Sequence, residues 1–180
     1  MAGTMTERQE CRVHIRWMIR RDMPEVLAIE AQSFEFPWYE KDFINCLRQW
    51  NCIGMVAERD DRVVGFIIYE LYKTRIRVVN FAVAEPSRRR GVGTQMMAKL
   101  IGELSSERRS RITLEVRETN LPAQLFFKIM GFRAVNILRN FYANTDTTEN
   151  AYSMQYRYGP PSDKTVPVFQ VINRITHLAE

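Results

Sequence analysis

The sequence predicts a mixed α/β fold of about seven strands and four helices, and two observations lead to it. Alternating apolar runs, typical of strands, and runs with helical spacing follow one another in the order β-αα-βββ-α-β-α-ββ. In the middle of the chain a strand-like run, residues 78–83, leads through a glycine turn into a helix-like run, residues 95–104. At 180 residues the chain is long enough for one domain with a substantial core.

The strands are predicted from short apolar runs bounded by turn residues. Asp60 and Asp61 mark a tight turn between two of them, and a polar loop, residues 143–150, separates the last two. In the strand 111–116 every second residue is apolar, so the carboxylate of Glu115 points to the other face. The predicted strands cover residues 13–17, 52–58, 62–72, 75–83, 111–116, 133–142 and 151–158.

The helices are predicted from apolar residues at helical spacing and from residues that favour helix ends. Asp22 and Pro24 open the first helix, with Asp22 as the N-cap and Pro24 in the first turn. Asn120 opens the last helix, and Gly131 has the conformational freedom to end it. The other two predicted helices cover residues 39–50 and 95–104.

Composition and charge place the chain among globular proteins of the cytoplasm. Hydrophobic residues make up 46% and charged residues 26%, and no apolar stretch has the length of a signal peptide or a membrane span. The three cysteines are odd in number and lack metal-ligand spacing, so we expect free thiols and no metal site. The net charge of +5 is compatible with a nucleic-acid, ribosomal or phosphorylated partner. Because the arginines are scattered, we interpret the excess as a solvated face, with no direct contact to nucleic acid or membrane.

Three segments are predicted along the chain. Residues 13–158 form the domain, residues 1–12 a flexible extension, and residues 159–180 an appendage. Residues 166–178 have the pattern of a short helix or strap. The sequence leaves open whether this segment covers a groove or mediates dimerisation, and so leaves open a monomer or a homodimer.

The run Arg88-Arg89-Arg90-Gly91-Val92-Gly93-Thr94 predicts an anion site. Glycines permit a tight turn and a close approach of the backbone to a ligand. The helix that follows directs its unpaired N–H groups and the positive end of its dipole at the turn, which favours a phosphate. The run lacks the Lys-Ser/Thr of a P-loop and the third glycine of a dinucleotide fingerprint, so neither of those sites is expected.

Two motifs resemble the GNAT family of N-acetyltransferases. The pattern Arg88-x-x-Gly91-x-Gly93 resembles that family's loop for the pyrophosphate of acyl-CoA. Its second cofactor motif resembles Asn120-x-x-Ala123-x-x-Phe126-Phe127-x-x-x-Gly131-Phe132. Within the family, four further pieces are similar to the RimI-type ribosomal-protein-alanine N-acetyltransferases. They are Ile29-Glu30 through Phe36-Pro37-Trp38, Asn80-Phe81-Ala82-Val83, Leu114-Glu115-Val116-Arg117-x-x-Asn120, and Arg139-Asn140-Phe141-Tyr142.

The resemblance covers most of the chain, residues 13–156, and implies a mostly antiparallel sheet that splays open where acetyl-CoA binds. It implies Glu115 as the general base, acting directly or through a water, although a surface glutamate is the alternative. The substrate groove would be shaped by Glu30, Phe36, Pro37 and Trp38, with a core position as the alternative for Trp38. The implied cofactor contacts are Phe81, Ala82, Val83, Arg88, Arg89, Arg90, Gly91, Val92, Gly93, Thr94, Asn120 and Phe127, with a plain helix N-cap as the alternative for Asn120.

The sequence departs from the family at two places. Pro86 stands one position later than usual, with Glu85 in its place, which reshapes the loop entrance. Phe127 stands where the family has the tyrosine that donates a proton to the CoA thiolate, and a phenylalanine cannot donate. Tyr142 is the replacement we expect, as general acid or as a grip on the substrate N-terminus. The alternatives are a thiolate that leaves unassisted or through water, and an ordinary strand aromatic at position 142.

The acceptor is expected to be a protein N-terminal α-amine. With ordinary pKa values, roughly one α-amine in seven is neutral at pH 7, against well under one lysine in a thousand. Together with the resemblance this favours the N-terminal alanine of a ribosomal protein, acetylated by direct attack in a ternary complex. Two alternatives stay open at this point: an acetyltransferase for lysine side chains, polyamines or other small amines, and a non-catalytic acyl-CoA-binding module.

Overall fold

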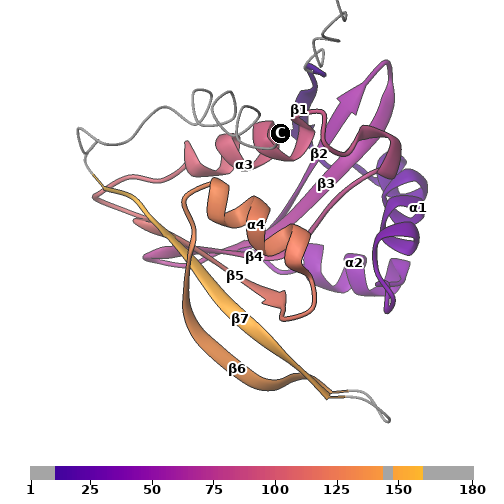
Figure 1. The fold of residues 1–180 in the computed structure, drawn as a ribbon. Coiled ribbons are helices and arrows are strands. Elements are labelled where there is room, and N and C mark those ends of the chain that lie inside the picture. Colours follow the sequence, from indigo (N-terminus) through magenta and orange to yellow (C-terminus); the bar gives the residue numbers. More distant parts are fainter. Residues whose placement is uncertain (1–10, 144–147, 160–180) are drawn as a thin grey trace, which may run out of the picture. The chain divides into compact units, whose positions relative to one another are not determined.

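The computed structural model describes residues 11–143 and 148–159, and within them the elements follow the predicted order (Figure 1). The strands are β1 His14–Trp17, β2 Cys52–Arg59, β3 Arg62–Leu71, β4 Arg75–Val83, β5 Arg111–Arg117, β6 Arg133–Ala143 and β7 Thr148–Arg157. The helices are α1 Met23–Ser33, α2 Glu40–Leu47, α3 Val92–Ile101 and α4 Leu121–Ile129, with 3-10 turns η1 Arg20–Asp22 and η2 Glu85–Ser87. None of these helices is long and apolar enough to cross a bilayer.

The strands form one mixed sheet in the order β1-β2-β3-β4-β5-β7-β6. β1 with β2, β2 with β3, β5 with β7, and β6 with β7 pair antiparallel. β4 and β5 pair parallel, and their register joins residues 75–77 to residues 111–113. The mixed α/β class and the mostly antiparallel sheet of seven strands are therefore confirmed.

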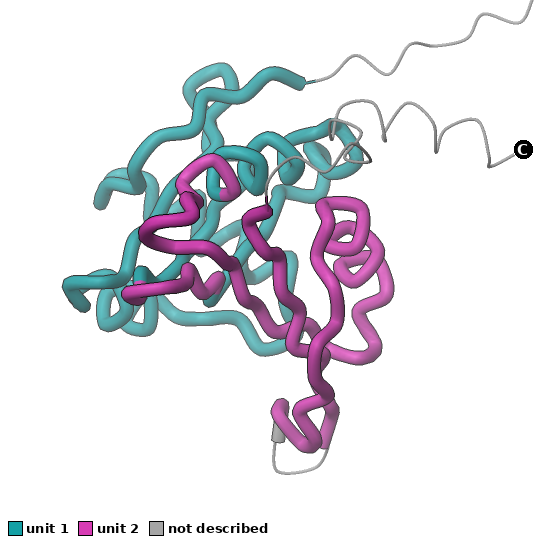
Figure 2. Tube along the Cα trace, turned by 90° about the vertical axis from the view of Figure 1, so that its left-hand side faces the viewer, with its two compact units in different colours: residues 1–71, 79–100 teal, residues 72–78, 101–180 magenta. Residues whose placement is uncertain are grey.

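The described chain divides into two compact units (Figure 2). Unit 1 holds residues 11–71 and 79–100, and unit 2 holds residues 72–78, 101–143 and 148–159. β4 begins in unit 2 and ends in unit 1, and its pairing with β5 lies within unit 2. Residues 1–10, 144–147 and 160–180 lie outside the described residues, and with them most of the predicted extension and appendage, including residues 166–178.

Unit 1 has an aromatic core between α1, α2 and the strands. Phe43 and Phe66 are fully buried, with ring centroids 5.6 Å apart in an edge-on arrangement. Trp38 packs edge-on against Phe43 at 5.2 Å. Rings in this geometry contribute about 0.5–1.5 kcal/mol beyond the area that they bury. Met96 and Met97 on α3 are also fully buried, so α3 supplies core volume as well as its N-terminus.

Unit 2 packs α4 on the strands through a run of rings. Phe127 lies 5.1 Å from Phe126 and 5.4 Å from Phe132, and Phe132 lies 5.6 Å from Tyr156 of β7. The helix ends as predicted at Gly131, whose φ is +92°. A side chain at this position would be strained, and its Cβ would meet the Tyr156 ring at 3.2 Å.

The bounds of α2 and α3 differ from the prediction, and α3 also ends three residues early, at Ile101. α3 begins at Val92 rather than at residue 95, because Gly91 takes φ +80° and its carbonyl already accepts a hydrogen bond from Gln95 N–H at 3.0 Å. α2 ends at Leu47 rather than at Trp50, and the Trp50 side chain is 94% exposed in the turn that follows. The turn at Asp60 and Asp61 is confirmed, with φ of 51° and 58°.

Candidate active site

The glycine turn of unit 1 lies at the start of α3. Arg89 and Gly91 both have left-handed backbone, with φ of +60° and +80°. A Cβ built on Gly91 meets open space apart from the Gln95 side chain at 3.8 Å, so a ligand can approach the backbone there. Because α3 begins at Val92, the N–H groups of Val92, Gly93 and Thr94 belong to its first turn, where a helix leaves them unpaired. This turn fits a pyrophosphate.

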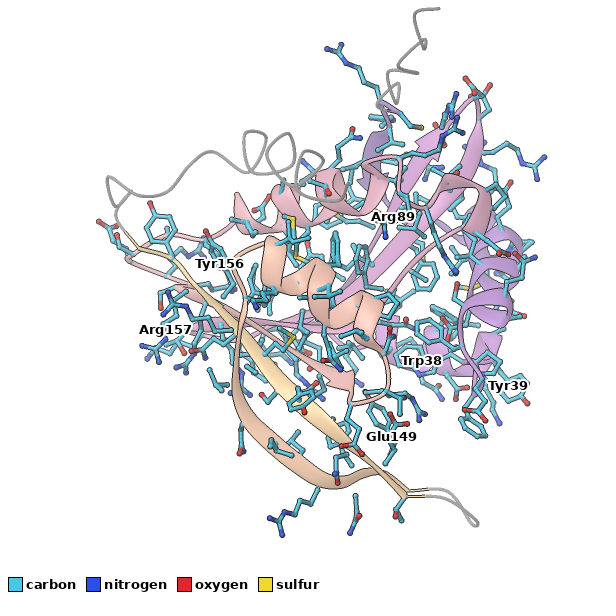
Figure 3. The ribbon with its side chains drawn as sticks, viewed as in Figure 1. Trp38, Tyr39, Arg89, Glu149, Tyr156 and Arg157 are labelled. Carbon is cyan, nitrogen blue, oxygen red and sulfur yellow. The ribbon has the colours of Figure 1, made fainter. Side chains whose placement is uncertain are left out.

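The three arginines of the turn have different roles. The Arg88 guanidinium donates from Nε to the Val83 carbonyl at 2.9 Å and from Nη2 to Ser33 Oγ at 2.9 Å. It therefore fastens the end of β4 to the end of α1 with two of its five N–H donors. The Arg90 carbonyl accepts from Cys11 N–H at 3.1 Å, while the side chains of Arg89 and Arg90 are exposed (Figure 3).

The end of β4 reaches this turn as a tightly packed strand. Ala82 is buried, and Phe81 and Val83 are half-buried on either side of it. Gly65 of β3 allows the close packing, because a Cβ there would meet the Ala82 carbonyl oxygen at 3.2 Å and Met96 Sδ at 3.1 Å. The predicted acetyl-lining residues are therefore held firmly beside the core of unit 1.

Glu30 lies on the buried side of α1 and holds the aromatic loop. Its side chain is only 1% exposed, and each carboxylate oxygen accepts one hydrogen bond. Oε1 accepts from the Trp38 backbone N–H at 2.8 Å, and Oε2 accepts from Asn80 Nδ2 at 3.0 Å. Burial raises the pKa of this carboxyl above its ordinary value, against the lowering effect of the two donors. Glu30 thus connects the loop to β4.

The remaining predicted groove residues differ in exposure. Phe36 is exposed, Pro37 is half-buried, and the half-buried Trp38 uses its ring on Phe43. The Trp38 ring therefore occupies the core position that was its alternative. Tyr39, the next residue, is exposed and is the N-cap residue of α2 (Figure 3). Phe36 is the most exposed of the three predicted groove residues in this loop.

Glu115 in unit 2 has the orientation that the alternation predicts. Ile112, Leu114 and Val116 are buried on one face of β5, and the Glu115 side chain, 18% exposed, points to the other. Its Oε2 lies 3.3 Å from Nη2 of Arg77 on β4, which is an ion pair between neighbouring strands of unit 2. The carboxylate is thus oriented by a cation that the sequence did not identify as part of the site.

Tyr142 lies near the end of β6, and charged side chains act on its hydroxyl. The Arg117 guanidinium stacks 4.1 Å from its ring centroid, and Arg117 Nη1 donates to Glu149 Oε2 at 2.6 Å. Burial is the main cause that raises the Tyr142 pKa; Arg117 and Arg77 lower it, and Glu115 and Glu149 raise it further. The phenol therefore stays protonated at neutral pH, as a proton donor requires.

The path of β6 explains why Tyr142 reaches this place. Its register with β7 shifts between Leu138 and Tyr142, and Asn140 within the irregularity has left-handed backbone with φ +53°. Asn150 Oδ1 accepts from Asn140 N–H at 3.0 Å, and Asn150 Nδ2 donates to Glu118 Oε2 at 3.0 Å. An irregularity of this kind turns a side chain away from the regular alternation of the strand.

Asn120 and Phe127 have structural roles on α4. Asn120 caps the helix, with Oδ1 accepting from Ala123 N–H at 3.1 Å. This is the N-cap role that the sequence left as an alternative, and it leaves a cofactor contact of Asn120 as a prediction. Phe127 is 6% exposed between Phe126 and Phe132, so the position of the family tyrosine is filled here by a core ring.

The structure adds residues that the sequence reasoning missed, namely Asn80, Arg77, Arg117, Thr119 and Glu149. Glu149 connects two of the others, because its Oε1 accepts from Thr119 N–H at 3.0 Å and its Oε2 accepts from Arg117. Arg117 stands two residues after Glu115, so strand alternation places both on one face and was a usable signal. Nothing in the local sequence pairs Arg117 with Glu149, 32 residues away.

The geometry of unit 1 fits a phosphorylated carrier, and unit 2 supplies a carboxylate together with a protonated phenol. These are the groups that an enzyme needs to transfer an acyl group from such a carrier to an amine. The class of protein is therefore an acyl-carrier-dependent transferase.

Comparison with known proteins specifies this class. The family model described as Acetyltransferase (GNAT) family matches residues 17–132. The chain belongs to this family, and it is an acetyl-CoA-dependent N-acetyltransferase.

Individual relatives support the same placement. The chain is 31% identical over 133 residues to the ribosomal protein bS18-alanine N-acetyltransferase of Salmonella typhimurium, covering 74% of this chain and 89% of the relative. It is 30% identical over 148 residues to the N-alpha-acetyltransferase of Sulfurisphaera tokodaii, covering 74% and 86%. The solved structure of the ribosomal-protein-S18-alanine N-acetyltransferase from Escherichia coli matches with a TM-score of 0.74 and 26% identity, covering 87% of this chain and all of that one.

Proposed function

We propose that this protein transfers the acetyl group of acetyl-CoA to the N-terminal α-amine of a protein, and that the N-terminal alanine of a ribosomal protein is its substrate. The observation that carries the proposal is that unit 2 holds both the Glu115 carboxylate and the Tyr142 phenol, and that Glu115 is one of the charges that raise the Tyr142 pKa. One group accepts the proton that the amine loses, and the other donates one to the leaving sulfur. The names of the relatives favour an α-amine over a lysine side chain.

Acetyl-CoA fits the glycine turn by its pyrophosphate. The first-turn N–H groups of Val92, Gly93 and Thr94 hold the phosphate oxygens, and the dipole of α3 favours their negative charge. Bound there, the cofactor supplies an acetyl thioester. Backbone N–H groups of residues 81–83 polarise the thioester carbonyl, which makes its carbon more electrophilic.

The residues of unit 2 move the protons. Glu115 accepts a proton from the acceptor ammonium, directly or through a water, and so frees the nitrogen lone pair for attack on the carbonyl carbon. As the C–N bond forms and the C–S bond breaks, Tyr142 donates its hydroxyl proton to the sulfur. The nitrogen loses its second proton to solvent as the amide forms. The proton gained by Glu115 restores Tyr142 through solvent, so both groups return to their starting states with one proton released overall.

The cytoplasmic location is part of the proposal, as is direct attack without a covalent enzyme intermediate. Cys11, Cys46 and Cys52 are buried and form no disulfide among the described residues, and none of them belongs to the motifs of the cofactor or the base. A buried thiol has little thiolate and is a poor nucleophile. The acetyl group therefore passes to the amine in one step, in a complex that holds both substrates.

The test is acetylation of three synthetic peptides by the purified full chain with acetyl-CoA. One peptide begins with alanine and lacks lysine, one has a blocked N-terminus and one lysine, and one has both blocked. Mass spectrometry locates the acetyl group, and thiol release measures turnover. We expect acetylation of the alanine peptide alone. Preference for the lysine peptide would overturn the acceptor, and CoA binding without thiol release would overturn the enzymatic function.

A further inference from the structure

The positive charge of this chain is concentrated in unit 2. Its described residues include 11 Lys or Arg against 5 Asp or Glu, a net charge of +6. The described residues of unit 1 include 12 against 11, a net charge of +1. Arginines that are scattered along the sequence are thus unevenly distributed between the units. An excess of positive charge attracts an anionic partner, or else its repulsion lowers the stability of the fold.

Strand register aligns three of these arginines across the sheet. Arg75 of β4 is the register partner of Arg111 of β5, and Arg111 is the register partner of Arg157 of β7. Register partners point to the same face, and neighbouring strands lie about 4.8 Å apart, so the three side chains start within about 10 Å of one another. We call Arg75, Arg111 and Arg157 the arginine row. Like charges placed directly opposite one another destabilise a sheet.

The arginine row has little compensation from within the protein. None of its three members forms an ion pair with any described residue. The Nε atoms of Arg75 and Arg111 are buried and lack a hydrogen-bond partner. Arg157 Nε donates to Gln155 Oε1, a neutral acceptor, at 2.7 Å. Buried Nε donors without acceptors are costly, and no ion pair among the described residues neutralises the charge of the row.

Aromatic and further basic residues surround the row. Arg75 stacks 4.7 Å from the ring centroid of Tyr72, and Arg109 Nε donates to the Tyr72 carbonyl at 2.9 Å. Tyr158, 46% exposed, follows Arg157, and its N–H donates to the Ser110 carbonyl at 2.7 Å. These hydrogen bonds connect the chain segments around Tyr72, Arg109 and Tyr158. Lys73 and Arg108 in the same segments are exposed.

We propose that the arginine row and its two tyrosines bind the phosphodiester backbone of a single-stranded polynucleotide. Planar guanidinium forks match phosphate oxygens, and aromatic rings stack on unpaired bases. An acidic peptide would satisfy the charges but gives no reason for Tyr72 and Tyr158 beside them. The inference departs from the expectation that the protein makes no direct contact with nucleic acid, and it does not depend on the proposed acetylation.

The test measures binding of fluorescent oligonucleotides to the full chain by anisotropy over a range of salt. The probes are oligo-uridylate and oligo-deoxythymidylate, and poly-glutamate is the competitor of another class. The row variant combines Arg75→Gln, Arg111→Gln and Arg157→Gln. Its matched control, Arg12→Gln with Arg20→Gln and Arg48→Gln, removes the same charge from exposed positions of unit 1.

We expect both oligonucleotides to bind, and the row variant to bind about ten-fold or more weakly, with a salt slope smaller by about two. The control variant should lose less than about two-fold. A ribose preference would identify RNA as the source of the phosphates. The proposal would be overturned if both variants lost the same affinity, or if the unmodified chain bound no oligonucleotide. It would also be overturned if poly-glutamate were the only competitor that displaced the bound probe.

A second variant covers the case in which the row variant fails to fold. Lys73→Glu with Arg157→Glu reverses charge at two exposed positions, where folding is least affected. Circular dichroism confirms that each variant is folded. Unchanged oligonucleotide binding by this folded double variant would also overturn the proposal.

Discussion

The Arg117 guanidinium lies 4.1 Å from the centroid of the Tyr142 ring, and its charge acts to lower the pKa of this proposed acid. A cation over the ring favours the phenolate, yet burial and the carboxylates of Glu115 and Glu149 outweigh it, so the Tyr142 pKa is raised. A tyrosine with a raised pKa is a weaker acid but remains protonated through the neutral range. This chain therefore has a donor, although Phe127 occupies the family's donor position.

Tyr142→Phe tests the donor directly. The substitution keeps the ring and its stacking on Arg117 but removes the proton, so we predict a kcat lower by about 10²-fold, with KM for the peptide changed little. Steady-state thiol release measures both constants. Tyr152→Phe on β7 is the matched control and should retain activity. An unchanged kcat would mean that the thiolate leaves without help from Tyr142.

Glu115→Gln tests the general base. The amide keeps the size of the side chain but cannot accept the amine proton, so we predict a kcat lower by about 10²–10⁴-fold. The residual rate should rise steeply with pH, because the neutral amine must then come from solution. Arg77→Gln removes the ion-pair partner at 3.3 Å and leaves the carboxylate. We expect this variant to lose less activity than Glu115→Gln. Full turnover of Glu115→Gln across the pH range would refute the assignment.

The sequence was sufficient for the parts of the site that depend on local pattern. Strand alternation gave the orientation of Glu115, and the glycines marked the turn at Gly91. It was insufficient where the partners lie far apart along the chain, as with Arg117 and Glu149. Glu30 shows the same limit, because a glutamate on a helix is ordinarily solvated and only tertiary packing buries this one against Trp38 and Asn80.

Local pattern also failed at the start of α3. Helical periodicity indicated residue 95, but Gly91 adopts φ +80° and lets the helix begin at once. That difference of three residues matters for function, since it makes the N–H groups of Val92, Gly93 and Thr94 the first turn of the helix. Which backbone conformation a glycine takes is decided by its surroundings and not by its own sequence signal.

Gly91→Ala tests this turn. A Cβ at φ +80° costs about 1–2 kcal/mol in backbone strain, and it narrows the approach to the N–H groups of α3. We predict that the dissociation constant for CoA, measured by calorimetry, rises about ten-fold. The control is Gly159→Ala, since a Cβ there meets nothing within 4 Å. Equal CoA affinity in the Gly91 variant would show that the turn does not hold the pyrophosphate.

Glu30→Gln tests the buried connection between α1, Trp38 and Asn80. Burial raises the pKa of Glu30, so the folded protein binds this proton more tightly than the unfolded chain does. The free energy of unfolding should therefore fall as pH rises from about 4.5 through the raised pKa, and stay level above it. Glutamine cannot ionise, can still accept from Trp38 N–H, and can donate to Asn80 if that amide reverses.

We predict that Glu30→Gln removes this pH-dependent loss and unfolds at neutral pH with a free energy within about 1 kcal/mol of the parent or above it. Glu30→Ala should instead lose about 2 kcal/mol or more, because it leaves the two buried donors without an acceptor. Urea unfolding at several pH values separates the cases. A parent protein whose stability rises over the same window would show that Glu30 is ionised more easily in the fold than in water, which contradicts the role given to its burial.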